Sequence, residues 1–283
     1  MKPDIDLNSP YVKIAISEAQ RLAAIALAAE QSVEKAVIPI YHVPVGRRMA
    51  QIGSGVLIRI NNEYFILSAS HVFDHIGTHA LLTSDGTGAE VQVLAGERFS
   101  TPRGQSGTHT DDPLDASAYH IQSPMSDTLK SYAITMDDFD SAPPVRSTCT
   151  FLSAGFRIRK SNMAGGAIRS QREAFPSFEI RESDYDLLKL DPSLSIALWH
   201  EEQILLENRW QLSPTPRGFS GGAIIKVIGL PTQQGITYKQ VLTGIVTEHR
   251  KKSKNIEGVL IGTRISVHMA AIQRFMPELF NEN

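Results

Sequence analysis

Residues 217–225 read RGFSGGAII, and this stretch decides the fold. A serine between glycines suits two different structures. In the first, the serine sits at a sharp turn between a strand and a following helix. In the second, it lies in a glycine-rich loop that leads into a strand. The two structures differ in fold class and in the order of the partner residues along the chain, so the neighbouring sequence has to separate them.

The flanks of Ser220 favour the loop. Pro214, Pro216 and Gly218 precede the serine and disfavour a regular strand immediately upstream. After it, AIIKVIG is a run of apolar and β-branched residues, which predicts a strand rather than a helix. We therefore interpret the segment around Ser220 as a loop between β-strands. In that arrangement the serine's partners, a histidine and then an aspartate, lie upstream.

From Ile38 onward the sequence is typical of an all-β protein. Short apolar or alternating runs rich in Val, Ile and Thr are separated by Gly, Asn, Asp and Pro. The clearest hairpin joins GSGVLIRI (53–60) to EYFILSAS (63–70) through two asparagines, which tolerate the positive φ of a tight turn. Polar residues 100–115 predict a long surface loop, and residues 125–145 a seam between two β subdomains. Further predicted strands are AYHI, CTFLSAGF, GAIIKVI, QVLTGIVT and GVLIGTRI.

Helical patterns are confined to the two ends of the chain. Ser9-Pro10 suits an N-cap followed by a first-turn proline, and the alanine-rich stretch after it predicts one helix over residues 10–35. We expect its apolar side chains to pack on the main body. Residues 266–280 carry apolar side chains at spacings of three and four and predict a C-terminal helix.

A histidine and an aspartate with suitable surroundings lie upstream of the serine. His71 directly follows the strand in FILSASHVF, and Asp115 opens DASAYHI. Together with GFSGGAII, these motifs in this order resemble those of the chymotrypsin-like serine proteases. The resemblance covers roughly residues 45–275 and implies an all-β fold of two six-stranded antiparallel β-barrels. The expected divisions are an N-terminal helical extension (1–37), a first barrel (38–130), a second barrel (131–265) and a C-terminal helix (266–283).

The resemblance assigns catalytic roles to His71, Asp115 and Ser220. A serine hydroxyl is a weak nucleophile, so it needs a base such as histidine, whose reference pKa is about 6.5. A buried carboxylate fixes the tautomer of the imidazole, and the N–H groups of Gly218 and Ser220 would form an oxyanion hole. The expected activity is hydrolysis of peptide bonds through an acyl-enzyme, with no cofactor and no metal. Asp112 stays an alternative to Asp115 because both acids lie in the same loop.

Substrate preference is indicated only weakly. The resemblance places the primary substrate pocket at Pro214-Thr215, Thr247-Glu248-His249 and Gly258–Gly262. No aspartate lies at its expected base, which argues against cleavage after Lys or Arg. Thr215, Thr247 and His249 suggest a small polar pocket for an acidic or small residue.

Phe219 departs from the pattern of the digestive members of the family, which carry an aspartate just before the serine. In those members the aspartate pairs with a newly formed N-terminus. We therefore expect a protein that needs no such processing. A dormant protein of the same fold, acting as a peptide-binding or scaffold protein, is the alternative. The intact set of Ser220, His71 and Asp115 argues against it.

The remaining histidines give weaker signals. His71 begins HVFDH, whose spacing matches an inverted zinc motif, but Asp74 stands where that motif needs a glutamate. A single helical turn is therefore expected, without a metal. We expect His75, His79 and His109 to be exposed polar residues.

Composition narrows the classes of partner. The 28 basic and 30 acidic residues give a net charge of -2, so no bulk field points to nucleic acid or to a membrane surface. A protein or peptide substrate is the expected partner, with the N-terminal helix as a candidate docking element for a regulatory protein.

Two features of the sequence indicate the cellular compartment in which we expect the protein. Cys149 is the only cysteine, which excludes an intramolecular disulfide and favours the cytoplasm over secretion; we expect it to be buried and inert. The apolar run LAAIALAA (22–29) is far shorter than the roughly 20 residues that cross a bilayer. The acidic residues before it disfavour a signal peptide.

Overall fold

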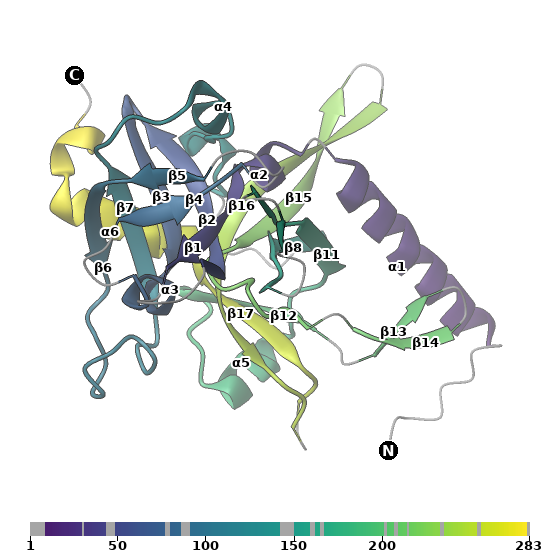
Figure 1. Cartoon of the computed structure of the whole chain (residues 1–283). Helices are drawn as coiled ribbons and strands as arrows, with labels where there is room; N and C mark the ends of the chain where they lie inside the picture. The colour runs from purple at the N-terminus through teal and green to yellow at the C-terminus, as the bar shows by residue number, and fades with distance from the viewer. Residues whose placement is uncertain are drawn as a thin grey trace.

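The computed structural model describes residues 9–29, 31–43, 49–76, 80–85, 91–141, 150–158, 162–164, 167–200, 203–206, 209–213, 215–232, 235–253 and 256–281 of the 283-residue chain. Most strands belong to two antiparallel sheets, one of seven strands and one of six. Figure 1 shows the two sheets side by side, with helices around them. The prediction of a mostly β protein with antiparallel sheets is confirmed.

The first sheet comes from the N-terminal half of the chain. Its strands lie in the order β5-β4-β1-β2-β3-β7-β6. The predicted hairpin is formed by β2 and β3 around Asn61, whose φ of 53° is the left-handed conformation that asparagine tolerates. The strands are β1 (Val37–His42), β2 (Ala50–Ile60), β3 (Glu63–Ala69), β4 (Leu81–Thr83), β5 (Gln92–Leu94), β6 (Gly96–Ser100) and β7 (Ala116–Ile121).

The second sheet follows in the C-terminal half, with the order β11-β8-β15-β16-β17-β12. Two short hairpins, β9 (Asn162–Ala164) with β10 (Ala167–Arg169) and β13 (Gln203–Leu206) with β14 (Arg209–Leu212), are separate from it. Each of the five further runs that the sequence singled out coincides, apart from a residue at one or both ends in three of them, with part or all of a strand. The strands of the sheet are β8 (Thr150–Phe156), β11 (Arg172–Ser177), β12 (Ser195–Trp199), β15 (Ala223–Thr232), β16 (Gly235–Arg250) and β17 (Val259–Arg264).

One apolar cluster joins the two sheets. Val56 and Phe65 from the first sheet belong to the same buried cluster as Leu152, Ile225 and Leu242 from the second. All five side chains are fully buried. Burial of apolar surface is the main stabilising term in folding, and a shared core fixes the position of one sheet against the other. Loops from the two sheets can therefore meet in a defined geometry.

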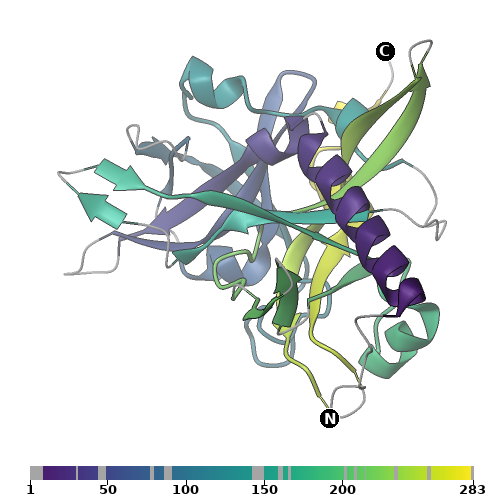
Figure 2. The ribbon, with the colours of Figure 1, turned by 90° about the vertical axis from the view of Figure 1, so that its right-hand side faces the viewer.

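The N-terminal segment forms two helices instead of the predicted single helix. α1 (Pro10–Ala28) ends where Ala29 takes an extended ψ of 159°, and α2 (Ser32–Ala36) follows. The break allows Val33 to enter the shared core. α1 packs against β8 and β11 through one face, and Figure 2 shows it lying diagonally across these strands. Leu27 was expected in that packed face but is largely exposed.

The C-terminal helix is shorter than predicted. α6 (Ile265–Phe275) stops before Met276, and a 3-10 turn (Pro277–Phe280) follows. Proline disfavours the helical conformation in the residue before it, which explains the interruption. Among the described residues, no helix has the length and apolar character needed to span a membrane.

The described residues 125–141, between the two sheets, have little regular structure, as expected of a loop-like segment. They contain α4 (Asp127–Lys130) and a 3-10 turn (Met136–Asp138). Cys149 lies outside the described residues. The remaining helices are α3 (Ser70–Asp74), directly after β3, and α5 (Glu182–Leu188), before β12.

Candidate active site

The pairing of β3 with β7 brings His71 and Asp115 together. Ala69, the last residue of β3, lies opposite Ala116, the first residue of β7. Ser70, which follows β3, therefore adjoins Asp115, which precedes β7. The Ser70 N–H donates to the Asp115 carbonyl at 2.9 Å. His71 follows in the first turn of α3.

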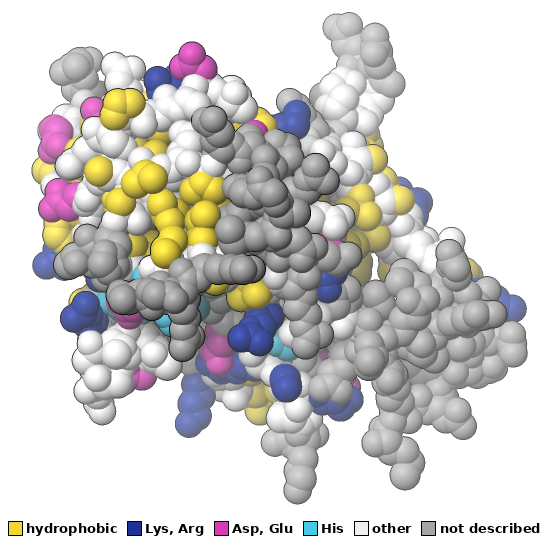
Figure 3. Space-filling model, in the orientation of Figure 1, with side chains coloured by type: hydrophobic (Ala, Val, Ile, Leu, Met, Phe, Trp, Pro, Cys, Tyr) yellow, Lys and Arg dark blue, Asp and Glu magenta, His cyan; other side chains and the backbone are white. Residues whose placement is uncertain are grey.

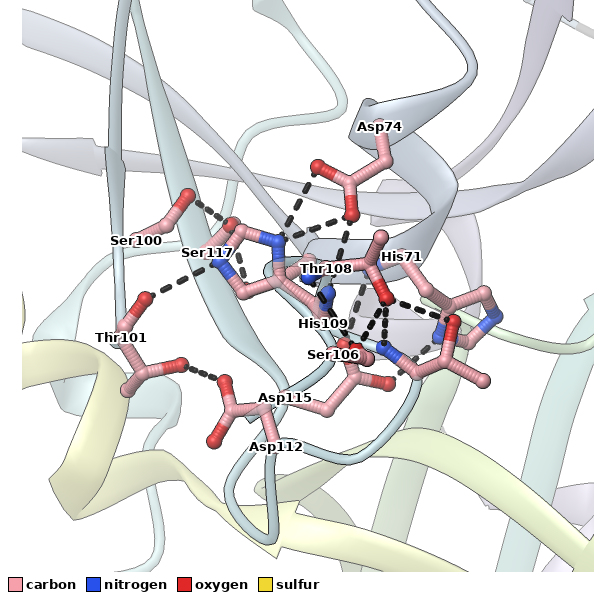
Figure 4. Close-up of polar contacts among 12 residues, drawn as sticks. His71, Asp74, Ser100, Thr101, Ser106, Thr108, His109, Asp112, Asp115 and Ser117 are labelled. Atoms are coloured by element: carbon pink, nitrogen blue, oxygen red, sulfur yellow. Dashed lines mark hydrogen bonds and ion pairs between the residues drawn. The ribbon is translucent and has the colours of Figure 1, made fainter. Parts of the chain in front are cut away.

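Both oxygens of the Asp115 carboxylate face His71. Oδ2 lies 2.5 Å from Nδ1 of the ring, and Oδ1 accepts from the His71 backbone N–H at 2.9 Å (Figure 4). An ionised carboxylate only accepts hydrogen bonds, so Nδ1 carries a proton, which leaves Nε2 of neutral His71 as an acceptor. Asp115 is buried, whereas the His71 side chain is 32% exposed. The pair therefore presents a basic nitrogen at the surface.

Asp112 does not take part in this pair. Its Oδ1 accepts from the Leu114 N–H at 3.0 Å, and its Oδ2 accepts from the Thr101 hydroxyl. Both hydrogen bonds are therefore to residues of the loop that carries Asp112. Of the two aspartates that the sequence left open, the structure places Asp115 against His71.

The Ser220 loop packs closely against the first sheet. The Ser54 N–H on β2 donates to the Ser220 carbonyl at 2.8 Å. Gly221 follows with a φ of 83°, and a Cβ there would lie 2.0 Å from the Ser54 carbonyl and 2.1 Å from Oγ of Ser68. Only glycine can combine this conformation with this approach. The glycine after the serine in GFSGG therefore reflects a close contact between the loop and the two strands β2 and β3.

Phe219 anchors the loop on its other side. The side chain is fully buried and stacks on Phe175 of β11, with ring centroids 5.4 Å apart. It also covers Gly155 of β8, where a Cβ would come within 2.8 Å of its ring. The residue before the serine is thus held by apolar contacts within the second sheet.

Two backbone N–H groups beside Ser220 are available to a ligand. The Arg217 carbonyl accepts from the Ile158 N–H at 3.1 Å. Because N–H and C=O of a trans peptide point in opposite directions, the Gly218 N–H points away from Ile158. Among the described residues, neither the Gly218 nor the Ser220 N–H has an acceptor. Two free donors so close together suit an anionic oxygen.

Ser220 lies next to the His71 helix through a shared neighbour. A Cβ on Gly53 would lie 2.8 Å from the Val72 side chain and 2.9 Å from the Ser220 carbonyl. Val72 follows His71 directly, so the serine loop and α3 meet at this glycine. Within the described part of the chain, no hydrogen bond joins the Ser220 hydroxyl to His71. Such bonds are often long before substrate binds.

A hollow of about 820 Å³ opens beside His71. Thr247 lines it, as predicted, but Thr215 and His249 do not. Thr215 is exposed, and the His249 ring packs edge-on against His200 at 4.9 Å. Pro214 lies outside the described residues. Of the segments predicted to form the pocket, Thr247, Glu248 and Ile261 line this hollow.

Charged side chains that the sequence did not single out as a group line this hollow. They are Lys189 directly after α5, Glu248 and Arg250 on β16, and four aspartates of α3 and the loop before β7, Asp74, Asp111, Asp112 and Asp115. They come from distant segments, so no local motif could show that they meet. Figure 3 shows histidine, acidic and basic side chains gathered below the first sheet, where α3 lies in Figure 1.

His109 is buried, whereas the sequence predicted an exposed residue. It is 3% exposed and its Nδ1 lies 2.9 Å from Oδ2 of Asp74. Its Nε2 lies 3.0 Å from the Thr101 carbonyl. Burial tends to raise the pKa of Asp74, but hydrogen bonds and charge from His109, together with the charge of Arg98, outweigh this and lower it.

The HVFDH segment forms the short helix expected of it. α3 has five residues, and Asp74 is bonded to His109 and Arg98. His75 is exposed as predicted, and His79 lies outside the described residues. In the described ranges, no three His, Cys, Asp or Glu side chains are grouped in a way that could hold a metal ion.

Comparison with known proteins gives no match to this chain, either among protein-family models or among curated protein sequences. The functional assignment therefore depends on the chemistry of the site. Its components are the His71–Asp115 pair, Ser220, and the free N–H groups of Gly218 and Ser220.

Proposed function

We propose that this chain is a serine endopeptidase of the chymotrypsin-like fold, with its two sheets as the two barrels. The observation that carries the proposal is the hydrogen-bonded His71–Asp115 pair. Among the described residues its Nε2 has no hydrogen-bond partner, and α3 adjoins the loop that bears Ser220. A base held in one tautomer by a buried carboxylate is what activation of a serine hydroxyl requires.

The proposed reaction uses these groups in turn. His71 takes the hydroxyl proton as Oγ of Ser220 attacks the peptide carbonyl, and Asp115 stabilises the resulting imidazolium. The N–H groups of Gly218 and Ser220 bind the oxyanion of the tetrahedral intermediate. His71 then gives its proton to the leaving amine. Water, deprotonated by His71, hydrolyses the acyl-enzyme and restores the serine.

An open strand edge supports a peptide as the substrate. β15 pairs with β16 only as far as Ala223 opposite Ile245, whereas β17 continues to pair up to Arg250 opposite Val259. The last residues of β16 therefore have a partner strand on one side, and Thr247 lies in the lining of the hollow beside His71. An extended peptide can add to such an edge through main-chain hydrogen bonds.

The charges of the hollow indicate which peptides would bind. Glu248 and Arg250 form an ion pair at 2.9 Å, so these two charges largely offset each other. Lys189 is exposed and has no ion pair among the described residues. The hollow is also lined by Asp74, Asp111, Asp112 and Asp115, so we expect its charges to disfavour an acidic side chain near the scissile bond.

The test is removal of the nucleophile. Ser220→Ala should lower turnover of a peptide substrate by about a million-fold. A fluorophosphonate probe should label the wild-type protein at Ser220, and His71→Ala should abolish labelling. Unchanged turnover in Ser220→Ala would refute the proposal. Peptide binding without labelling of the wild type would instead favour a dormant, peptide-binding protein. Cleavage of a peptide library then gives the preference.

A further inference from the structure

We infer that Asp74 and the buried His109 form a positioning pair for the proposed active site, holding Asp115 in place against His71. The inference rests on the proposed function for its kinetic test. The two pairs run in opposite directions between the same two segments. α3 contributes His71 and Asp74, and the loop between β6 and β7 contributes Asp115 and His109 (Figure 4). Two hydrogen-bonded side-chain pairs therefore hold the loop against α3.

Both ring nitrogens of His109 face acceptors. Nδ1 lies 3.0 and 2.9 Å from the two carboxylate oxygens of Asp74, and Nε2 lies 3.0 Å from the Thr101 carbonyl. Neither a carboxylate nor a carbonyl can donate, so both nitrogens donate only when His109 is protonated on each. His109 is then an imidazolium paired with a carboxylate, and charge-assisted bonds of this kind are the stronger ones. Arg98 adds a second cation to Asp74 at 3.3 Å.

A short chain of hydrogen bonds connects His109 to Asp115. Thr101, whose carbonyl His109 binds, also accepts at Oγ1 from the Ala116 N–H at 3.1 Å. Ala116 is the neighbour of Asp115. The same hydroxyl donates to Asp112, and the Asp112 N–H donates to the His109 carbonyl at 3.3 Å. Thr101 at the start of the loop is therefore bonded directly to His109, and Ala116 at its end is bonded to Thr101.

Asp115 needs such support because of its backbone. Its φ of 45° lies in the left-handed region, which costs a non-glycine residue free energy. Strained conformations persist only where the surrounding structure holds them. Without the Asp74–His109 pair we expect the Asp115 backbone to relax and its carboxylate to move away from Nδ1 of His71.

The experiment uses the full-length chain with His109→Leu and His109→Asn. Asparagine keeps one donor within reach of Asp74, so it should restore part of what leucine removes. For His109→Leu we expect kcat to fall about a hundredfold with little change in KM, as for a small displacement of a catalytic group. The proton NMR resonance of His71 Nδ1–H, shifted far downfield by its short bond to Asp115, should disappear. Asp74→Asn should act in the same direction.

His120→Leu is the matched control. His120 is also buried and bonded to a carboxylate, Glu63 at 2.7 Å, but it lies on β7 away from the loop. It should lower stability while leaving kcat and the His71 resonance unchanged. Retention of kcat and of the resonance in folded His109→Leu or Asp74→Asn would overturn the inference. If Ser220→Ala kept full turnover, the proposed function would fail, and the resonance alone would still decide whether His109 positions Asp115.

Discussion

The hydroxyl of Ser54 donates a hydrogen bond of 2.8 Å to the carbonyl of Gly218. The same hydroxyl accepts from the Phe156 N–H at 2.9 Å, and the Ser54 N–H holds the Ser220 carbonyl. One buried residue of the first sheet thus binds two carbonyls of the serine loop and one N–H of the second sheet. The loop that carries the proposed oxyanion donors is therefore held in place by a side chain that does not itself take part in the chemistry.

Ser54→Ala should weaken both stability and turnover. It leaves the Gly218 carbonyl and the Phe156 N–H buried without partners, which should lower the free energy of unfolding by about 2 kcal/mol. The Gly218–Phe219 peptide, which lies between the two peptides that carry the donor N–H groups, would lose its orientation and let them shift, so kcat should fall at least about tenfold while KM changes little. Denaturant unfolding and peptide hydrolysis measure the two effects. Ser153→Ala is the control, since its hydroxyl makes only a 3.5 Å bond to Phe175. Equal kcat in the two variants would contradict the prediction.

Gly221→Ala should be much more harmful than Gly107→Ala. Both glycines have positive φ, 83° and 75°, so alanine pays a similar conformational cost of about 1–2 kcal/mol at each. At Gly107 nothing lies within 4 Å of the added Cβ, whereas at Gly221 backbone and hydroxyl oxygens lie at 2.0 and 2.1 Å. We expect Gly107→Ala to remain active and Gly221→Ala to lose activity and several degrees in Tm. Similar melting temperatures would show that the loop can move away.

Much of the site could be predicted because its parts are local patterns. His71 and Ser220 each stand beside a recognisable strand, and the strands appear as apolar, β-branched runs. The sequence favoured Asp115 but could not exclude Asp112, because the distinction depends on the register of β7 against β3. That register is a long-range property, set by which side chains enter the shared core.

His109 was misjudged for a related reason. It lies among Gly, Ser, Thr and Asp in a loop that looks fully solvated. Its burial comes from Asp74, which lies one turn of helix after His71. An aspartate at that position together with a histidine in the following polar loop is a signal that could have suggested the pair. The helix break at Ala29 had no such signal, because alanine is the strongest helix former.

Phe219→Asp should disable the serine loop. The position is fully buried among apolar side chains, and a carboxylate there would have no partner, which costs several kcal/mol. Phe219→Ala should lower the free energy of unfolding by about 3–5 kcal/mol through the cavity it leaves. Phe178→Asp is the control, since the Phe178 side chain is 37% exposed and its carboxylate replacement can reach water. Thermal unfolding and fluorophosphonate labelling report the outcome; full labelling of Phe219→Asp would contradict the prediction.

Turnover should not require a free N-terminus. In the digestive proteases that the sequence resembles, an aspartate before the serine pairs with a new N-terminal amine, but here Phe219 holds the loop by stacking on Phe175. A protein carrying a tag before Met1 should therefore hydrolyse peptides as fast as the protein from which the tag has been removed. An increase of tenfold or more on removal, about 1.4 kcal/mol in the barrier, would indicate control by the N-terminus.

His268 should make the protein less stable in mild acid. The side chain on α6 is fully buried, its Nδ1 has no hydrogen-bond partner in the described residues, and its Nε2 lies 3.3 Å from the Ser68 carbonyl. Burial lowers the pKa of His268 to about 4, below the value of about 6.5 expected in the unfolded chain. The unfolded state therefore binds the proton more tightly. Stability is full above about pH 6.5 and falls as the pH drops towards 4, by about 3 kcal/mol in total.

His268→Leu should remove this part of the pH dependence, so its free energy of unfolding should fall less between pH 7 and pH 4 than that of the wild type. Other titrating groups are common to both proteins, so the difference between the two curves isolates His268. His75→Gln, at an exposed position on the end of α3, should follow the wild-type curve. Because α6 packs on β7 and β16, protonation at His268 would loosen the contact between the two sheets that places Ser220 beside His71. Activity lost at low pH should then return when the pH is raised. Parallel curves of unfolding free energy against pH for His268→Leu and the wild type would show that His268 does not cause the loss of stability.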